Sequence, residues 1–330
     1  MMEIIRKYID HVRNIRRYSE RTVRLYEDVL NRYVQMVFPE GVPDESGFIE
    51  SFNRFEIRGF MVALMEQEGL SAKSVSMHMS ALSSFCRYLV KEGMIKSNPV
   101  RTVTRPKVEK RLPEYFREEG MTAYFDKTRE EASAECLAIF EENIDNDHAK
   151  MLYEKRLARL IISILYDTGL RRSELIGLKI ENVDFARQTL KVVGKGNKMR
   201  EIPLLASLCQ EILLYLEAVE ALVCGKRSLK EPLLVTFRGR PLYPVYVDRT
   251  VKSELGNIKG ITGRKSPHVL RHSIATELMN EGTDLNSIKE MLGHSSLGTT
   301  QVYTHSSFAR LKDIYEHAHP RAKNGGKHGD

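Results

Sequence analysis

The chain has 330 residues, which is enough for two domains with separate hydrophobic cores. Its formal charge of +7 at pH 7 and its pI of about 9.1 favour a polyanionic partner. The charged N-terminus lacks an apolar signal segment and no apolar run approaches membrane-spanning length, which argues against a secreted or membrane protein and predicts a cytoplasmic one without membrane contact.

Residues 1–100 are predicted to form a helical bundle, because apolar residues recur there at spacings of three and four. Ser19 and Ser71 stand where N-terminal caps are expected, and Gly93 follows the last apolar residue of a helix. Gly and Pro residues break the pattern between about 39 and 47, where a loop is expected. The predicted helices cover about 3–17, 19–37, 54–68 and 71–92.

One side of this bundle carries basic residues that are candidates for DNA contact: Arg16, Arg17, Arg21 and Lys73. Taken alone, they are better explained as ordinary surface cations. A protein that cuts duplex DNA must also hold it, so phosphate contact becomes the favoured interpretation if a cleavage site lies downstream.

The composition changes after the bundle. Residues 101–113 contain two prolines and many cations without an apolar period, which predicts an interdomain linker. Residues 114–320 are expected to form a second domain, with helical patterns near 120–127 and 133–142 in its acidic first part. Residues 321–330 are rich in glycine and charge and are predicted to be a disordered tail.

An apolar helix from about Lys150 to Thr168 leads to the first candidate catalytic residue. Gly169 is a helix stop, and Arg171 follows it in the segment TGLRRSEL. A planar guanidinium at this place could bind phosphate oxygens in bidentate fashion. Glu174 has two interpretations: it orients an active-site cation, or it is a first-turn carboxylate favoured by the helix dipole.

The segment VVGKGNKMREIPL, residues 192–204, predicts two short strands joined by a turn at 194–197. Lys195 would lie at the tip, where a flexible cation can reach a phosphate oxygen. A lysine in such a turn often has no function, so this residue gains weight only from the others.

The stretch 266–303 holds the remaining catalytic residue types. Pro267 begins a helix that Gly282 ends, and Asp284 caps a second helix that Gly293 ends. The candidates in this stretch are His268, Arg271, His294 and Tyr303.

These residue types together fit phosphoryl transfer through a covalent tyrosine intermediate. A phenol needs a base or nearby positive charge to act as a nucleophile, and arginines bind the charged oxygens of a pentacovalent phosphate. His268 and His272 have the spacing of a zinc pair, but Val269 stands where the metalloprotease motif needs glutamate. The scattered cysteines have no CxxC pair, so we expect reduced thiols and no metal: Cys86, Cys136, Cys209 and Cys224.

Four segments, TGLRRSEL, GKGNK, HVLRHSIAT and LGHSSLGTTQVYTH, together resemble the tyrosine recombinase (phage integrase) superfamily. The resemblance covers nearly the whole chain and is strongest to the XerC/XerD group of chromosome-dimer resolvases, down to the ending IYEHAHPRAK. It implies a mainly α fold, with a DNA-clamping core-binding domain at 1–100 and an α-rich catalytic domain with a small antiparallel sheet at 114–320. The motif favours Arg171 over Arg172 as the first arginine, and residues 128–150 look like an insertion.

The resemblance also implies a mechanism without cofactor or metal. Tyr303 would attack the scissile phosphate to give a 3′-phosphotyrosyl link, while Arg171 and Arg271 hold its non-bridging oxygens. Lys195 would protonate the departing 5′-oxygen. Two histidines would assist, His294 by a hydrogen bond to the phosphate and His268 by proton transfer at the tyrosine.

The partners implied by the resemblance begin with double-stranded DNA that carries a specific recombination site. Exchange between two duplexes needs four active sites, which implies a homo- or hetero-tetramer on DNA. A second Xer-like recombinase and a septal DNA translocase are further expected partners, and a short amphipathic helix at 307–317 would dock into a neighbouring subunit.

Two other functions stay open. A mobile-element integrase would use the same chemistry on element ends, and the apparent insertion at 128–150 mildly favours it. A DNA-binding partner subunit that never cleaves is the other, although the tyrosine and both arginines are present.

Overall fold

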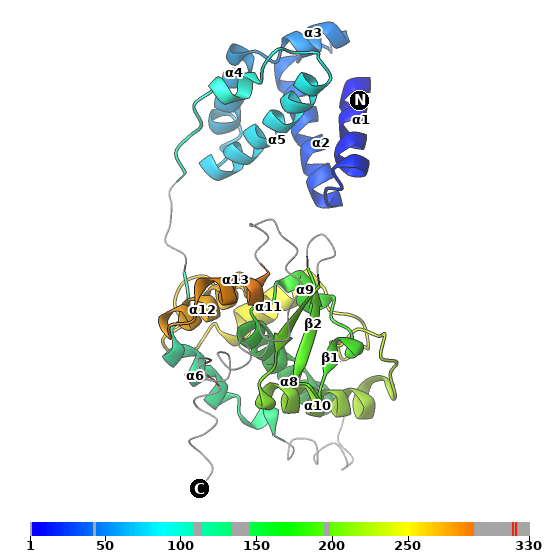
Figure 1. The fold of residues 1–330 in the computed structure, drawn as a ribbon, viewed down its shortest axis with the longest axis vertical. Helices are drawn as coiled ribbons and strands as arrows, with labels where there is room; N and C mark the ends of the chain where they lie inside the picture. The colour runs from blue at the N-terminus through cyan, green and yellow to red at the C-terminus, as the bar shows by residue number, and fades with distance from the viewer. Residues whose placement is uncertain are drawn as a thin grey trace. The chain divides into compact units, whose positions relative to one another are not determined.

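The computed structural model describes residues 2–41, 44–108, 114–133, 146–194, 199–293, 319 and 321. The chain divides into two compact units, residues 1–111 and 112–330 (Figure 1). Each unit has its own hydrophobic core. The described residues are mainly helical and include one small antiparallel sheet, which confirms the predicted fold class.

The N-terminal unit is a helical bundle with an aromatic core. Its described elements are α1 (Glu3–Asp10), the π-helical turn η1 (His11–Ile15), α2 (Glu20–Val37), α3 (Glu45–Glu50), α4 (Arg54–Glu66), α5 (Ala72–Lys91) and the 3-10 turn η2 (Pro99–Thr102). Ser19 Oγ accepts from the N–H of Thr22 and Ser71 Oγ from that of Ser74, so both predicted caps are confirmed. The rings of Tyr8 and Phe85 pack edge-on in the core, and other aromatic pairs there are stacked or tilted.

The loop expected at 39–47 is shorter than predicted. Asp44 Oδ1 accepts from the N–H of Gly47 at 2.9 Å and caps α3, which begins at Glu45. Phe48, fully buried on this helix, supplies the apolar contact that a one-turn helix needs.

The segment expected as a linker begins packed on the bundle. Val100 and Val103 are buried in the N-terminal core, and Arg105 Nη1 donates to Ser80 Oγ of α5 at 2.9 Å. Apolar side chains at these two positions hold the chain down despite its prolines and cations. Residues 109–113 lie outside the described part of the chain.

The C-terminal unit surrounds one long helix with shorter helices and a three-stranded sheet. Its described helices are α6 (Glu118–Lys127), α8 (Asn146–Thr168), α9 (Arg172–Ile176), α10 (Ala206–Val219), α11 (Pro244–Glu254), α12 (Pro267–Asn280) and α13 (Leu285–Leu292), with short turns η3 (Glu130–Ala132), η5 (Ile180–Asn182) and η6 (Glu220–Cys224). The strands are β1 (Val183–Asp184), β2 (Thr189–Val193) and β3 (Met199–Pro203).

The sheet has the order β1-β2-β3 with antiparallel pairing, and β2 and β3 form the predicted hairpin. Val192 pairs with Arg200 and Leu190 with Ile202, and all four side chains are buried. The alternation along β3 therefore turns Arg200 inward together with Ile202.

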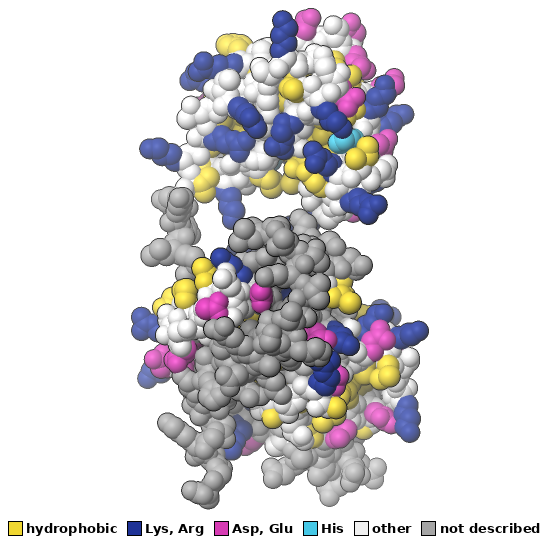
Figure 2. All heavy atoms as spheres, in the orientation of Figure 1, with side chains coloured by type: hydrophobic (Ala, Val, Ile, Leu, Met, Phe, Trp, Pro, Cys, Tyr) yellow, Lys and Arg dark blue, Asp and Glu magenta, His cyan; other side chains and the backbone are white. Residues whose placement is uncertain are grey.

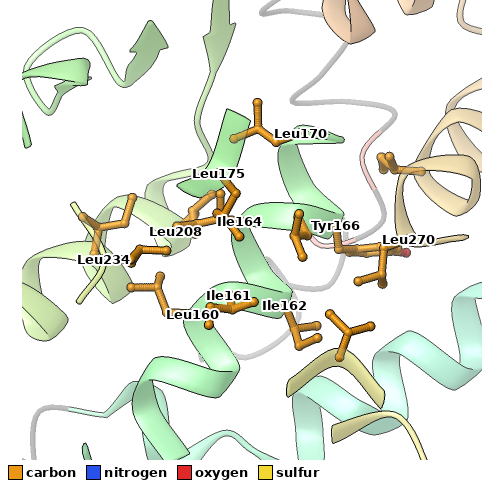
Figure 3. Packing of buried hydrophobic residues seen from close by; sticks show 14 of the residues in the cluster. Leu160, Ile161, Ile162, Ile164, Tyr166, Leu170, Leu175, Leu208, Leu234 and Leu270 are labelled. Atoms are coloured by element: carbon orange, nitrogen blue, oxygen red, sulfur yellow. The ribbon is translucent and has the colours of Figure 1, made fainter. Parts of the chain in front are cut away.

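Helix α8 forms the centre of this unit's core (Figure 3). Leu208 of α10 and Leu234 lie on one side of it, and Leu270 of α12 lies on the other. A helix that is apolar on several faces is typical of a buried core position. Every residue of α8 from Arg156 to Thr168 is buried, so this half of the helix gives a fixed support to the turn that follows Thr168.

Two glycines end helices beside each other in space. Gly169 (φ 60°) follows α8, and Gly293 (φ 66°) follows α13 in the left-handed conformation that glycine adopts without strain. A Cβ on Gly169 would lie 2.5 Å from the Leu292 side chain, so the two helix ends are in direct contact. Asp284 caps α13 as predicted.

The C-terminal region differs from expectation at Arg321, which was placed at the start of a disordered tail. Its guanidinium donates to Asp167 Oδ2 at 2.5 Å and to Glu211 Oε1 at 2.6 Å and lies 4.0 Å from the Phe125 ring centroid. Two buried carboxylates and an aromatic face hold this residue against the unit. The helices expected near 133–142 (beyond Ser133) and at 307–317 lie outside the described residues.

Candidate active site

Arg171 lies in the turn between α8 and α9 and occupies the cap position of α9. Its backbone N–H donates to Glu174 Oε2 at 2.9 Å, and its Nη1 donates to Glu174 Oε1 at 2.7 Å. Its Nη2 donates to the carbonyl of Gly293 at 2.9 Å. The side chain is still 34% exposed, so the N–H groups not used within the protein are available to a ligand.

Arg271 lies on α12 and is almost buried. Its Nη1 donates to the carbonyl of Gly169 and its Nη2 to the carbonyl of Leu292, both at 2.5 Å. Burial and the nearby charge of Arg171 lower the pKa of Arg271 to about 10, against the opposing effect of Glu174. The guanidinium therefore stays protonated at neutral pH, and two positive charges are held close together.

Glu174 receives hydrogen bonds at both carboxylate oxygens. Besides the two from Arg171, Arg200 Nη1 donates to Oε1 at 3.1 Å and Arg200 Nη2 to Oε2 at 2.8 Å. Burial opposes the charged form, but the hydrogen bonds from Arg200 and Arg171 outweigh it and lower the pKa of Glu174 to about 2. The contacts agree with both interpretations: Glu174 is a first-turn carboxylate of α9, and it also binds the Arg171 guanidinium.

Arg200 was missed by the sequence interpretation. It is buried on β3, and its Nε donates to the carbonyl of Met291 at 2.9 Å. The one available signal was the alternation of β3, which gives Arg200 the same inward direction as Ile202.

The C-terminal end of α13 is bound by three arginines from three different segments. The carbonyls of Met291, Leu292 and Gly293 accept from Arg200, Arg271 and Arg171 respectively. Carbonyls at a helix end lack partners within the helix and carry the negative end of its dipole, so they attract cations. We call this arrangement the three-arginine cluster. The last of its three carbonyls belongs to Gly293, the residue before His294.

His268 is exposed in the first turn of α12, three residues before Arg271. Partial burial and the nearby His272 and arginines lower its pKa below the usual value. The imidazole is thus neutral around pH 7 and has a nitrogen that can accept a proton. His272 is also exposed.

Three predicted site residues, Lys195, His294 and Tyr303, lie outside the described residues. The structure therefore brings together Arg171 and Arg271 and places His268 on the same helix as Arg271. Gly194 is the described residue directly before Lys195, and Gly293 is the one directly before His294.

Arg172 differs clearly from Arg171. Its Nη1 donates to Asp248 of α11, away from Glu174 and the end of α13. The motif favoured Arg171 over Arg172 as the first arginine, and it is Arg171 whose described contacts reach Glu174 and Gly293.

In the N-terminal unit the four DNA-contact candidates are all exposed: Arg16, Arg17, Arg21 and Lys73. Figure 2 shows Lys and Arg side chains spread over one face of this unit. Arg17 adopts φ 51°, an uncommon backbone conformation for a residue other than glycine.

No helix among the described residues is long and apolar enough to cross a membrane. No group of three or more His, Cys, Asp or Glu side chains in the described ranges is arranged to hold a metal ion.

Models of two protein families match the chain. The model described as the phage integrase family matches residues 142–310, and that described as the phage integrase N-terminal SAM-like domain matches residues 5–93. The tyrosine recombinase XerC of Chlorobaculum parvum is 35% identical over 321 residues, covering 96% of this chain and 94% of the relative. XerC of Bacillus subtilis is 33% identical over 321 residues and covers 96% of both chains.

Solved structures have the same fold at lower identity. The XerH site-specific recombinase bound to palindromic difH substrate, in its post-cleavage complex, is 19% identical with a TM-score of 0.63, covering 98% of this chain and 83% of that one. The Tn1549 transposon integrase in complex with a circular intermediate DNA is 18% identical with a TM-score of 0.62 and covers 98% of both chains.

Proposed function

Because this chain belongs to the phage integrase family of tyrosine recombinases, we propose that it cleaves and rejoins DNA through a 3′-phosphotyrosyl intermediate on Tyr303. The observation that carries this proposal is the pairing of Arg171 and Arg271 at the end of α13. Two guanidinium groups from distant segments, one partly exposed, form a site for the oxygens of a single phosphodiester.

The arginines have donors left for such a phosphate. A guanidinium carries five N–H groups, whereas the described contacts of Arg171 and Arg271 each use two nitrogens of the side chain. Their carbonyl and carboxylate partners fix both planes before the substrate arrives. A preorganised cation stabilises the charge that develops on the non-bridging oxygens in the transition state.

The remaining residues move protons or add hydrogen bonds. Tyr303 Oη attacks phosphorus and passes its proton to the neutral imidazole of His268, whose lowered pKa suits this step. The bond from phosphorus to the 5′-oxygen breaks, and Lys195 donates a proton to that oxygen. His294 hydrogen-bonds the same phosphate.

Strand exchange then follows without an energy source. The 5′-hydroxyl of a partner strand attacks the phosphotyrosine, the link to Tyr303 breaks, and the tyrosine regains its proton. Because one phosphodiester is exchanged for another through a phosphotyrosine, the reaction needs no nucleotide cofactor.

We propose Xer-type resolution of chromosome dimers as the biological role. It is supported by curated relatives named XerC that are 30–35% identical over nearly the full length of both chains. The acting form would be a homo- or hetero-tetramer on double-stranded DNA, with a second Xer-like recombinase and a septal DNA translocase as partners. A mobile-element integrase and a non-cleaving partner subunit are the alternatives.

The test is covalent capture of DNA. The protein is incubated with sheared genomic DNA of its source organism and denatured with detergent, and the attached DNA is sequenced. Tyr303→Phe runs beside it, with Tyr115→Phe, an exposed tyrosine of the same unit, as matched control.

We expect adducts from the wild type and from Tyr115→Phe, and none from Tyr303→Phe. A single chromosomal pseudo-palindrome among the attached sequences supports dimer resolution, whereas element ends support the integrase. Tight DNA binding by the wild type without any adduct would support the non-cleaving subunit and contradict the proposed chemistry.

A further inference from the structure

Arg200 has no role in the reaction as proposed, yet it is one of the few buried cations of the C-terminal unit in the described ranges. All three of its side-chain nitrogens donate hydrogen bonds, one to Met291 and two to Glu174. Burying a guanidinium is costly unless it is fully paired, so this geometry points to a specific task.

The first task concerns Arg171. Each oxygen of Glu174 accepts one hydrogen bond from Arg171 and one from Arg200, which fills about four acceptor positions of the carboxylate. Without Arg200, two acceptor positions of a buried carboxylate lose their donors, and Arg171 is the cation left beside them. The guanidinium of Arg171 would then be drawn toward Glu174 and away from a phosphate.

The second task concerns the end of α13. Arg200 Nε holds the carbonyl of Met291, and a Cβ on Gly293 would lie 3.0 Å from Arg200 Nη1. The guanidinium is thus the surface against which the left-handed residue Gly293 packs. His294 follows this residue directly in the sequence.

The third task concerns the hairpin. Arg200 belongs to β3, and the segment that connects β2 to β3 contains Lys195. Its hydrogen bonds to Glu174 therefore tie the base of this hairpin to the turn that carries Arg171.

We propose that Arg200 is a positioning residue of the strand-cleavage reaction, which holds Arg171, the β2–β3 hairpin and the end of α13 in one arrangement through Glu174 and the Met291 carbonyl. This inference rests on the proposed function. A lysine cannot take over fully, because one ammonium lacks the planar fork that binds both carboxylate oxygens while a third nitrogen reaches Met291.

The test compares cleavage rate with DNA affinity. The DNA is the sequence recovered from wild-type adducts, nicked so that the cleaved fragment diffuses away and the adduct accumulates. Single-turnover adduct formation at saturating protein gives the rate, and gel mobility shift gives the affinity. The variants are Arg200→Met, Arg200→Lys and Glu174→Gln, and the double variant of Arg200→Met with Glu174→Gln.

Arg187→Met is the matched control. Arg187 is an exposed residue in the turn between β1 and β2, so this variant makes the same change of charge without touching Glu174 or α13. Thermal melting of every protein shows which variants are folded at the assay temperature. If Arg200→Met does not fold, Arg200→Lys carries the comparison.

We expect Arg200→Met to slow adduct formation by about 100-fold or more with affinity within about threefold, because small misplacements of reacting groups cost about this much. Arg200→Lys should recover at least about tenfold of the loss and still cleave at least about threefold more slowly than wild type. The double variant should be no slower than Arg200→Met alone, since the neutral amide at position 174 no longer attracts the guanidinium of Arg171.

Three results would overturn the inference. The first is a cleavage rate within about threefold of wild type for Arg200→Met, or for Arg200→Lys where only that variant folds. The second is a loss of DNA affinity as large as the loss of cleavage rate, and the third is a double variant whose loss of rate is the product of the losses of Arg200→Met and Glu174→Gln. An inactive wild type is distinguishable from these results, because it would contradict the proposed function itself.

Discussion

The two units of this chain place their charged side chains differently. In the N-terminal unit, the described buried residues are apolar or aromatic, with a few serines and one histidine. The C-terminal unit buries Asp167, Glu174, Glu211 and Glu277, together with several arginines. Apolar packing alone can build a helical bundle whose cations face outward, whereas a site for a phosphate needs cations held by buried partners.

In the described part of the C-terminal unit, buried carboxylates and arginines meet in two centres. One is the three-arginine cluster around Glu174, and the other joins Glu211 to Arg159, Arg321 and Ser163. The second centre lies on α8 and α10 and fastens a residue near the C-terminus to the core. The C-terminal unit therefore adds buried ionic pairs to its apolar core, whereas the described core of the N-terminal unit is packed mainly from apolar and aromatic side chains.

The largest expected effect comes from removing a buried carboxylate. Glu211→Ala leaves Arg159 buried without its carboxylate partner and should destabilise the C-terminal unit by about 3–5 kcal/mol. The chain has no tryptophan, so hydrogen exchange read by mass spectrometry is used to follow each unit separately. Glu217→Ala, an exposed position of the same helix, is the control.

Equal acceleration of exchange in both units would contradict the expectation that Glu211→Ala destabilises the C-terminal unit alone. Unchanged exchange in the C-terminal unit of Glu211→Ala would contradict the predicted destabilisation itself, since the buried pair would then contribute nothing.

Several features of the fold could be predicted because their causes are local. The caps Ser19, Ser71 and Asp284 and the helix-ending Gly293 act within a few residues of themselves, and the helical spacing identified the buried faces. The hairpin was also predictable, since two short apolar strands flank a glycine-rich turn.

Other features depend on partners far away in the sequence. Glu174 meets Arg200 across 26 residues, and Arg321 meets Asp167 across 154. No local spacing indicates which arginine reaches which carboxylate, so Arg200 was missed and Arg321 was assigned to a disordered tail. The sequence could identify the candidates Arg171 and Arg271, but not the helix end that they share.

A smaller effect should appear in the pH dependence. Burial raises the pKa of Glu277 to about 7, although Tyr166 donates a hydrogen bond to it. The folded state then holds a proton that the unfolded state loses above about 4.5, so stability falls as pH rises from about 4.5 to 7. Glu277→Gln should remove about 3 kcal/mol of this decrease.

Thermal melting between pH 4.5 and 8 measures the effect, with exposed Glu290→Gln as the control. A wild-type curve and a Glu277→Gln curve that run parallel over this range would show that Glu277 does not titrate as described. The N-terminal unit should change little, because the described buried set there contains no carboxylate.

The smallest effect concerns a helix cap of the N-terminal unit. Ser19→Ala removes the acceptor for the N–H of Thr22 and should destabilise that unit by about 1 kcal/mol. Ser46→Ala, at an exposed position of α3, should be close to neutral. Faster hydrogen exchange in the C-terminal unit of Ser19→Ala as well would mean that the two units do not unfold separately.

The central claim, that Tyr303 is the nucleophile, is tested most directly by identifying the residue that carries DNA. Adducts formed with the recovered target are digested with nuclease and protease, and the modified peptide is sequenced by tandem mass spectrometry. We predict a nucleotide joined through its 3′-phosphate to Tyr303. A nucleotide on any other residue, or a 5′-phosphate linkage, would contradict the account.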